Sequence, residues 1–397
     1  MKISFVQPKS FHSWEALGVG YMIAHLKAHG FEDVDFYSGF FDSNEDILRG
    51  IAKSDIVCFG CTSPQMKHAL ALASHCKGKV VFGGVHPSAL PLETVQLDCV
   101  DSVVVGEGER AIVSMAKGQA NCDILRYGRI DELDDLPFPD RLAIKQERNI
   151  QVSYHDNGIR IGSIFTSRGC PFSCRFCASR AVWTKRVRYR SADSILEEFE
   201  QIVKEQRLDY IKFADDTFTL NKERVHDFCA KKIKSGVSHI PWGCNVRADT
   251  VDMELMRAMQ MAGCDSVWIG VESGSPTILA DMQKGENLEQ IEASFKMADE
   301  LGIRTRAYFL LGMPNETHED IDMTRDCADR INAYETGFTI LAPYPGTDFY
   351  DKEKHKNVDW SEVDEYNNNL TSTKHLSNTE LKERRHELKE RFPCRLR

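Results

Sequence analysis

Apolar residues along the chain fall into two series of strand-like runs, each alternating with stretches of helical spacing such as Leu17–His29. In the first series the predicted strands lie at 2–6, 34–37, 56–60, 79–82 and 102–105. Strands that alternate with helices form a parallel sheet with helices on both faces. Residues 1–118 are therefore predicted to form a small doubly wound α/β domain.

The second series follows a break in the pattern. Residues 119–159 are acidic and contain Pro137 and Pro139, which predicts an extended linker. The predicted strands then lie at 161–166, 210–214, 242–246, 266–271, 305–311 and 338–341, with helices between them. This series predicts a six-stranded partial β/α barrel over residues 160–349. Residues 350–397 are charged, and helical spacing from Thr379 onward predicts a small C-terminal helical extension.

Composition narrows the class of protein. The chain has 397 residues, of which 42% are hydrophobic, and its 50 Lys+Arg against 60 Asp+Glu give a formal net charge of −10. This balance argues against a nucleic-acid partner, which needs a basic surface. No apolar run approaches the ~18 residues of a membrane span, and the start of the chain does not resemble a signal peptide. Thirteen scattered cysteines favour a reducing, cytoplasmic location.

The sharpest chemical feature is a cysteine group directly after the first strand of the second series. Cys170, Cys174 and Cys177 form a CxxxCxxC pattern in a predicted loop. Thiolates select zinc, copper(I) or iron–sulfur clusters. A structural zinc site would need a fourth ligand nearby, but the next histidine is His226 and the next cysteine is Cys229. A four-iron cluster on three cysteines would leave one iron open, and three unliganded core cysteines are the alternative.

This pattern, with the aromatic Phe176 before the last cysteine, resembles the radical S-adenosylmethionine (SAM) superfamily. The resemblance implies a 4Fe-4S cluster whose open iron binds SAM. It also implies cleavage of SAM to a 5′-deoxyadenosyl radical that abstracts hydrogen from a substrate carbon. An electron donor such as flavodoxin or ferredoxin is an implied partner. The partial barrel of this superfamily agrees with the strand count reached above.

Residues at successive strand ends of the predicted barrel extend the resemblance. By resemblance, Asp215 and Asp216 occupy the position that contacts the amino group of SAM. Arg247 and Glu272 would lie by its carboxylate and ribose, and Gly312 would lie in the turn on the adenine side. A guanidinium suits a carboxylate, and a carboxylate suits hydroxyl groups. For the two adjacent aspartates, a solvated turn is the alternative.

The first domain resembles the cobalamin-binding domain that precedes one branch of this superfamily. The motifs that carry the resemblance are Gly83-Gly84-Val-His-Pro-Ser88 and Val103-Val-Val-Gly-Glu-Gly-Glu109. By resemblance, the Gly83-Gly84 pair lets the backbone pass a flat ligand, and the hydroxyls of Thr62 and Ser63 meet the nucleotide tail of cobalamin. Cobalamin binding is therefore predicted, with a vestigial domain as the alternative.

One departure from many cobalamin proteins concerns the axial histidine. The Asp-x-His-x-x-Gly motif that supplies it is missing, and His12 stands after the first strand without an aspartate to orient it. We therefore expect His12 to be a surface or core residue rather than a ligand.

These features predict a radical SAM enzyme, with cobalamin-dependent methyl transfer as the favoured reaction. The alternative is dehydration, decarboxylation, cyclisation or rearrangement without functional cobalamin. A non-enzymatic iron–sulfur or zinc module is disfavoured, because it has no use for Arg247 or Glu272. Lacking an evident recognition domain, the chain is expected to act on a small molecule, for example in natural-product biosynthesis. Cys244 and Tyr308 are candidate catalytic residues, with core packing the equal alternative.

Overall fold

The computed structural model describes residues 1–120, 122–366 and 368–393 and divides into two compact units. The N-terminal unit comprises residues 1–160, 178–188 and 344–362. The barrel unit comprises 161–177, 189–343 and the described part of 363–397. The stretch 119–159, predicted as an extended linker, belongs to the N-terminal unit and carries a short strand and a helix.

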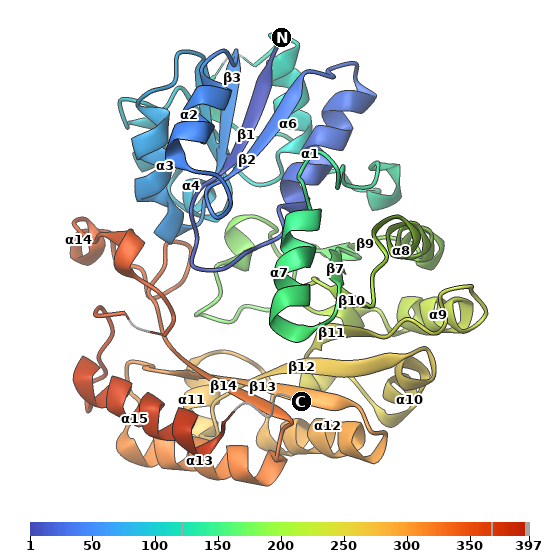
Figure 1. Cartoon of the computed structure of the whole chain (residues 1–397). Helices are drawn as coiled ribbons and strands as arrows, with labels where there is room; N and C mark the ends of the chain where they lie inside the picture. The colour runs from blue at the N-terminus through green and yellow to red at the C-terminus, as the bar shows by residue number, and fades with distance from the viewer. Residues whose placement is uncertain (121, 367, 394–397) are drawn as a thin grey trace. The chain divides into compact units, whose positions relative to one another are not determined.

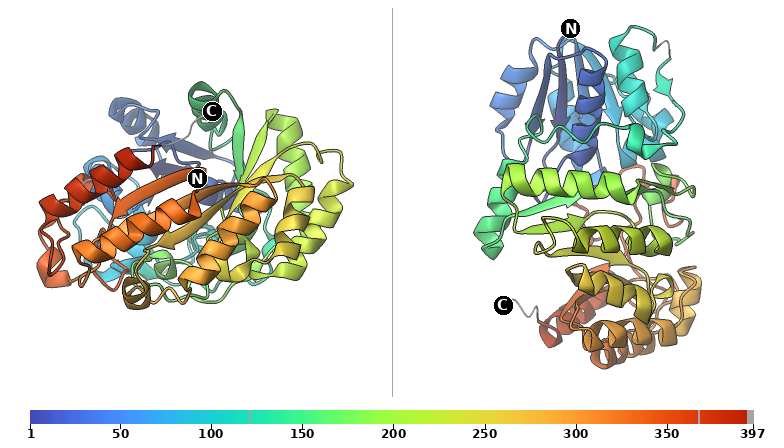
Figure 2. Two further views of the ribbon diagram at one scale, coloured as in Figure 1. Left: turned by 90° about the horizontal axis from the view of Figure 1, so that it is seen from below. Right: turned by 90° about the vertical axis from the view of Figure 1, so that its right-hand side faces the viewer.

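The N-terminal unit is built on a six-stranded sheet in the order β2-β1-β3-β4-β5-β6, and every neighbouring pair is parallel. Helices lie on both of its faces (Figure 2, right). The predicted doubly wound sheet is thus confirmed. Its strands are β1 (Ile3–Gln7), β2 (Val34–Ser38), β3 (Ile56–Gly60), β4 (Lys79–Gly83), β5 (Ser102–Val104) and β6 (Ile124–Leu125), of which the first three are labelled in Figure 1.

Some helices of this unit begin where a side chain caps the first turn. At α2, for example, the side chain of Ser43 accepts a hydrogen bond from the backbone N–H of Asp46 at 3.1 Å. The helices are α1 (Leu17–Ala28), α2 (Asn44–Ile51), α3 (Met66–Ala73), α4 (Val85–Ala89), α5 (Pro91–Val95), α6 (Glu109–Ala116), α7 (Glu147–Asn157) and α14 (Lys352–His355).

The strand order reverses between β1 and β3, because β2 lies on one side of β1 and all later strands lie on the other. The loops that follow β1 and β3 are tied together there by Gln65, whose Nε2 donates to the backbone oxygen of Pro8 at 2.8 Å. Ligands of open α/β sheets bind at the carboxyl ends of the strands at such a point. This edge is therefore the candidate ligand site of the N-terminal unit.

The barrel unit contains a second six-stranded parallel sheet, in the order β14-β13-β12-β11-β10-β7. The strands fan into a curved sheet with helices on its outer face (Figure 2, left). The predicted partial barrel is confirmed. Its strands are β7 (Ile161–Ile164), β10 (Tyr210–Phe213), β11 (Trp242–Val246), β12 (Cys264–Glu272), β13 (Arg304–Leu311) and β14 (Glu335–Ile340).

Capping residues start most barrel helices. At α13 the Thr317 hydroxyl accepts from the N–H of Asp320, whose carboxylate accepts in return from the backbone of Thr317. The helices are α8 (Ala192–Gln206), α9 (Lys222–Ile233), α10 (Met253–Met261), α11 (Pro276–Asp281), α12 (Leu288–Glu300), α13 (His318–Ile331) and α15 (Asn378–Arg391), which packs against β14. Two further strands are short: β8 (Ser167–Arg168) and β9 (Arg188–Tyr189).

The barrel core is an aromatic cluster between the sheet and the outer helices. Trp242 is fully buried, its Nε1 donates to the backbone oxygen of Ala262 at 2.9 Å, and its ring lies 5.1 Å from that of Phe213. Phe199, Phe218 and Phe228 complete the cluster. Trp242 is thus a core residue and not part of a cavity wall. The cluster fixes the strands, so the polar residues that follow their carboxyl ends are held at one edge.

Candidate functional site

The three cysteines of the CxxxCxxC pattern lie in one irregular segment, residues 170–177, which we call the cysteine loop. All three are half-buried, and the backbone turns so that the N–H of Cys177 donates to the oxygen of Cys174 at 3.2 Å. Arg175 ties the loop to the end of α11, because its Nη1 lies 2.6 Å from a carboxylate oxygen of Asp281. Burial raises the pKa of Cys170 and of Cys174.

Thiol donors of this kind fit an iron–sulfur cluster. Within the described ranges, however, no group of three or more His, Cys, Asp or Glu side chains is gathered closely enough to hold a metal ion. Neither a helix nor a strand lies between residues 170 and 177. Cluster binding therefore requires this loop to bring its thiols together.

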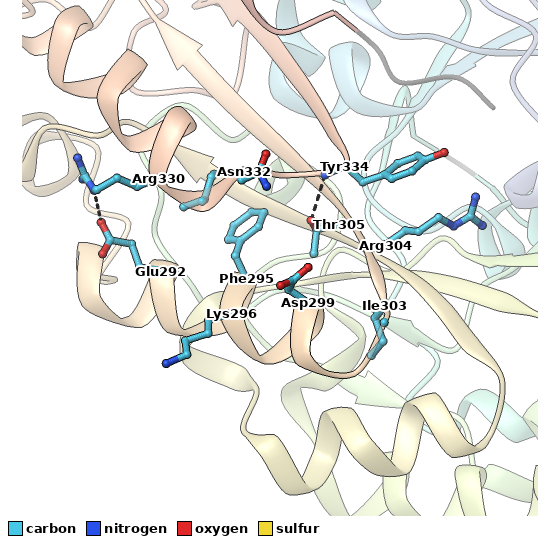
Figure 3. A pocket seen from close by; sticks show the side chains of 12 residues that line it. Glu292, Phe295, Lys296, Asp299, Ile303, Arg304, Thr305, Arg330, Asn332 and Tyr334 are labelled. Carbon is cyan, nitrogen blue, oxygen red and sulfur yellow. Dashed lines mark hydrogen bonds and ion pairs between the residues drawn. The ribbon is translucent and has the colours of Figure 1, made fainter.

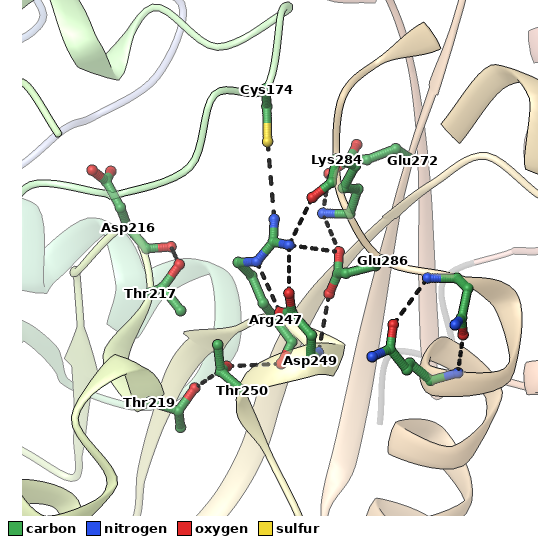
Figure 4. Close-up of polar contacts among 12 residues, drawn as sticks. Cys174, Asp216, Thr217, Thr219, Arg247, Asp249, Thr250, Glu272, Lys284 and Glu286 are labelled. Atoms are coloured by element: carbon green, nitrogen blue, oxygen red, sulfur yellow. Dashed lines mark hydrogen bonds and ion pairs between the residues drawn. The ribbon is translucent and has the colours of Figure 1, made fainter. Parts of the chain in front are cut away.

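Arg247, which follows β11, lies against the cysteine loop (Figure 4). Its guanidinium carbon is 3.5 Å from the ring centroid of Phe172, and its Nη1 donates to Sγ of Cys174 at 3.9 Å. Asp249 holds the guanidinium through two hydrogen bonds of 3.0 and 2.9 Å, and Nη2 also donates to the backbone oxygen of Lys284 at 2.8 Å. Most of the donors of Arg247 are thus already engaged within the protein.

Lys284 and two glutamates surround this arginine (Figure 4). Nζ of Lys284 lies 2.8 Å from a carboxylate oxygen of Glu286 and 3.5 Å from one of Glu272, and Glu286 lies 3.7 Å from Arg247. Burial alone would lower the pKa of Lys284, but the two carboxylates hold it above its usual value. Arg247, Asp249, Glu272, Lys284 and Glu286 are hereafter called the charge cluster.

Glu272 stands at a strained position in this cluster. Its backbone is left-handed, with φ of +68°, and the pairing of β12 with β13 shifts register between Gly270 and Glu272. A Cβ added to Gly270 would lie 2.3 Å from Oε1 of Glu272 and 3.3 Å from Nζ of Lys284. Gly270 is therefore required for Glu272 to fold back toward Lys284. Strain of this kind is concentrated at functional sites.

The two adjacent aspartates after β10 have different environments. Asp215 is 1% exposed, and its carboxylate accepts from the backbone N–H of Thr166 at 2.6 Å, from the Thr166 hydroxyl, and from the Ser167 hydroxyl at 2.6 Å. Asp216 is exposed. Its charge raises the pKa of Cys170, after the larger effect of burial. Asp215 thus fixes the loop after β7, while Asp216 lies within electrostatic range of the cysteine loop.

The remaining predicted residues of this unit occupy varied positions. Gly312 follows β13 with φ of +99°, and a Cβ there would lie 2.8 Å from Cγ2 of Thr371. Phe176 is half-buried in the cysteine loop. Cys244 is fully buried, and burial together with the neighbouring Cys264 raises the pKa of its thiol well above the usual value. Cys244 is therefore a core residue and does not face a cavity. Tyr308 is half-buried on the inner face of the sheet.

In the N-terminal unit, the predicted ligand residues lie at the edge where the strand order reverses. Thr62 is exposed after β3, whereas Ser63 is buried and its Oγ lies 2.9 Å from Nδ1 of His86. Burial lowers the pKa of His86 to about 4, so its ring is neutral at neutral pH. His12 is exposed and edge-on to the Trp14 ring. The Thr62 hydroxyl donates to Oε1 of Gln65 at 3.0 Å and remains exposed, whereas the Ser63 hydroxyl is buried against His86.

Two adjacent glycines, Gly83 at the end of β4 and Gly84 directly after it, also have different environments. Gly84 has φ of +96°, and a Cβ there would lie 2.8 Å from the backbone N and O of Cys61. A Cβ on Gly83 would meet nothing closer than the oxygen of Val104 at 3.7 Å. Gly84 is therefore required by the close approach of two backbone segments, while a Cβ on Gly83 would make only ordinary van der Waals contacts.

Phe172, Asp249, Lys284 and Glu286 of the site are not among the residues that the sequence pattern singled out. Lys284-Gly-Glu286 follows the short helix α11 and reads as an ordinary polar turn. In the sequence, the signal that could have pointed to Lys284 and Glu286 is this pair of opposite charges around Gly285, after the fourth barrel strand.

Within the described residues, no helix has the length and apolar character needed to cross a membrane.

Two protein families match the chain. Residues 164–328 match the Radical SAM superfamily, and residues 6–116 match the B12 binding domain. The first match covers the cysteine loop and the strands that bear the charge cluster. The second covers the strand ends of the N-terminal sheet.

The chain is similar to an uncharacterized methyltransferase of Pyrococcus horikoshii, at 32% identity over 359 residues, 83% of this chain and 76% of the relative. It is also similar to the anaerobic magnesium-protoporphyrin IX monomethyl ester cyclase of Rubrivivax gelatinosus, at 26% identity over 411 residues, 92% of this chain and 72% of the relative.

Among solved structures, the fold is similar to that of the radical S-adenosylmethionine methyltransferase TsrM of Kitasatospora setae, with cobalamin and a 4Fe-4S cluster bound. The TM-score is 0.73 at 19% identity, over 90% of this chain and 75% of that one. At this identity the similarity concerns the fold alone.

Proposed function

Because the chain belongs to the radical SAM superfamily and carries a B12-binding domain, we propose that it is a cobalamin-dependent methyltransferase acting on an unactivated carbon of a small molecule. The observation that carries the proposal is the position of the charge cluster beside the cysteine loop, where Nη1 of Arg247 lies 3.9 Å from Sγ of Cys174. Parallel β/α barrels place their chemistry at this carboxyl edge.

Cys170, Cys174 and Cys177 would be the protein ligands of the 4Fe-4S cluster. Two cations stand by them, because Lys284 and Arg247 both lower the pKa of the Cys174 thiol against the larger effect of burial. Positive charge of this kind favours the thiolate, which is the form that binds metal. When bound, the cluster and SAM supply a 5′-deoxyadenosyl radical, and cobalamin supplies the methyl carrier.

The charge cluster has the donors and acceptors that SAM requires. Nζ of Lys284 and the guanidinium of Arg247 suit the carboxylate of SAM, and Glu272 suits ribose hydroxyls. Asp216 is the exposed member of the aspartate pair and therefore the better candidate for the SAM amino group. Asp215 would act indirectly, by holding the loop after β7 in place.

In the N-terminal unit, the edge at the strand-order reversal would hold cobalamin. Gly83 supplies room at the end of β4, and the exposed Thr62 supplies a hydroxyl for the nucleotide tail. We assign no axial role to His12 or His86. His12 lacks an acidic orienter, and the Nδ1 of His86 is already engaged by Ser63.

Turnover would also need a one-electron donor, for which we propose a flavodoxin or ferredoxin. A second candidate reaction is ring closure, which the 26% identical relative named as a cyclase favours, since the similarity spans 92% of this chain. The two reactions differ in their SAM products. Methyl transfer releases S-adenosylhomocysteine in addition to 5′-deoxyadenosine, whereas ring closure by the radical alone releases only 5′-deoxyadenosine.

The test is anaerobic reconstitution with iron, sulfide and hydroxocobalamin, followed by reduction in the presence of SAM and analysis of the products. We expect both S-adenosylhomocysteine and 5′-deoxyadenosine from the wild type. Alanine at Cys170, Cys174 or Cys177 should abolish iron binding and both products, while alanine at the buried Cys229 or Cys264 should leave both. If protein that retains no cobalamin released 5′-deoxyadenosine without S-adenosylhomocysteine, ring closure would take the place of methyl transfer as the proposed reaction.

A further inference from the structure

The inner face of the barrel sheet carries polar and aromatic side chains. Along β13, Thr305, Ala307 and Phe309 are buried toward the outer helices. The alternate residues Arg306 and Tyr308 therefore project from the opposite, inner face, and both are half-buried. If the inner face of the sheet served only to pack against other elements, its side chains would be apolar. Arg306 and Tyr308 therefore require another explanation.

Neighbouring strands extend this arrangement at the same level. Trp268 of β12 and Glu335 of β14 stand directly beside Arg306 in the register of the sheet. Nζ of Lys212, on β10, lies 5.1 Å from the ring centroid of Trp268, and the guanidinium carbon of Arg306 lies 5.0 Å from that of Tyr308. Lys212, Trp268, Arg306, Tyr308 and Glu335 are hereafter called the inner wall.

Arg306 has unused hydrogen-bonding capacity. Its Nη2 lies 3.3 Å from Oε1 of Glu335, but its buried Nε has no hydrogen-bond partner in the part of the chain that the structure describes. A guanidinium has five N–H donors in a planar fork. Its side chain is 35% exposed, so part of the guanidinium can reach a ligand, although Nε itself is buried. Such a group recognises a carboxylate or phosphate.

The two sides of Tyr308 in the sheet differ. Gly337 is the neighbour of Tyr308 on β14, and a Cβ added there would make an ordinary van der Waals contact with Tyr308 at 3.7 Å. On the other side of Tyr308, the space above Gly270 is filled by Glu272 and Lys284 of the charge cluster. The inner wall therefore runs up to the proposed SAM site.

We propose that the inner wall binds the substrate and that this substrate is a planar aromatic or conjugated molecule with an anionic group. This inference rests on the proposed function. The two ring faces suit a planar body by stacking, and the guanidinium suits the anion. Charge supports the same class: the wall has two cations and one anion on a chain of net charge −10.

The test measures the binding of three probes to the reconstituted protein by isothermal titration, without turnover. The probes are indole-3-acetate, the uncharged indole-3-acetamide, and cyclohexylacetate, which has the charge but no planar ring. We expect indole-3-acetate to bind about ten- to hundredfold more tightly than either other probe. Arg306→Gln should remove the preference over the amide, and Trp268→Leu the preference over cyclohexylacetate.

Arg304→Gln is the matched control, because Arg304 lies on the same strand but pairs with Asp265 at 2.6 Å. It lines a separate pocket of about 590 Å³ at the amino ends of β13 and β14, beside Tyr334 (Figure 3). This variant should keep the full preference. Equal affinities for the three probes, or a preference that survives Arg306→Gln, would overturn the inference.

Iron content and SAM cleavage, measured on the same preparations, separate this inference from the proposed function. If SAM cleavage is intact but the three probes bind with equal affinity, only the inferred substrate class is overturned. Loss of cleavage in the wild type would remove the proposed function whatever the probes show. Where Trp268→Leu folds poorly, Trp268→Phe, which keeps a ring, should keep the preference for indole-3-acetate over cyclohexylacetate.

Discussion

Arg188 and Glu107 form a buried ion pair in the N-terminal unit. Nη2 of Arg188 donates to Oε1 of Glu107, and Nη1 donates to Oε2 at 3.1 Å. The side chains of Arg188 and Glu107 are only 3% and 4% exposed. Nη1 also donates to the backbone oxygen of Ile130 at 2.5 Å. Arg188 ends the segment 178–188, which begins directly after the last residue of the cysteine loop. The pair therefore anchors the far end of the segment that follows the cysteine loop.

The first prediction concerns this pair. Arg188→Met leaves the Glu107 carboxylate buried without its partner, and breaking a buried pair in this way costs roughly 3–5 kcal/mol. Stability should fall, and amide hydrogen exchange in residues 178–188 should accelerate. Arg186→Met is the control in the same segment, because its pair with Asp131 is 62% and 57% exposed and should contribute at most about 1 kcal/mol. Equal effects of the two variants would contradict the anchoring role.

The second prediction separates the adjacent aspartates. Asp215→Asn replaces an acceptor that serves Thr166 and Ser167, so the variant should lose about 1–3 kcal/mol of stability. Asp216→Asn changes an exposed residue and should leave the melting temperature unchanged, while weakening SAM binding about tenfold. Thermal unfolding and equilibrium SAM binding to the reconstituted protein measure the two effects. A loss of SAM affinity from Asp215→Asn alone, at unchanged stability, would reverse the assignment.

The sequence was sufficient for the features that depend on local pattern. Alternating apolar runs placed both parallel sheets, and the spacing of Cys170, Cys174 and Cys177 placed them in one loop. The position of Arg247 and Glu272 after successive strands also follows from pattern, because parallel strands end at the same edge. These predictions needed no knowledge of packing between distant segments.

The remaining features depend on tertiary contacts that a linear pattern does not contain. Lys284 becomes part of the site only because the turn after α11 returns to Glu272, which is 12 residues away along the printed sequence. Likewise, nothing local distinguishes Asp215 from Asp216. The hydrogen bonds from Thr166 and Ser167, donated across the sheet edge, make that distinction.

The third prediction uses Gly83, the last residue of β4, and the adjacent Gly84. Gly83→Ala should fold normally, since its Cβ has room, but it should lower retention of hydroxocobalamin if the ligand packs against this position. Gly84→Ala should instead destabilise the apoprotein by about 1–3 kcal/mol, because of its positive φ and its contact with Cys61. Gel filtration after reconstitution measures retention, with His12→Ala as a variant that should behave as wild type. Normal retention by Gly83→Ala would move the proposed cobalamin site away from β4.

The last prediction concerns pH and the buried Glu316, which follows Gly312 in the turn after β13. Its side chain is fully buried, Oε2 accepts from the N–H of Gly312, and Oε1 has no hydrogen-bond partner among the described residues. Burial raises its pKa from 4.5 to about 8, against the lowering effect of the N–H groups of Gly312 and Met313. The carboxyl group is therefore protonated in the folded protein at neutral pH.

The sign of the effect follows from proton binding. Between pH 4.5 and about 8 the unfolded chain has lost this proton while the folded protein retains it. The contribution of Glu316 to stability is thus fully present below pH 4.5 and is lost as the pH rises through about 8, by about 5 kcal/mol at most. Glu316→Gln keeps the shape without the proton equilibrium, so its stability should match the wild type near pH 5 and exceed it near pH 8. Urea unfolding at both values measures this, with the exposed Glu289→Gln as the control. If the free energy of unfolding changed equally with pH in the wild type and in Glu316→Gln, the folded protein would accommodate the ionised carboxylate. The turn at Gly312 would then have to open toward water above neutral pH.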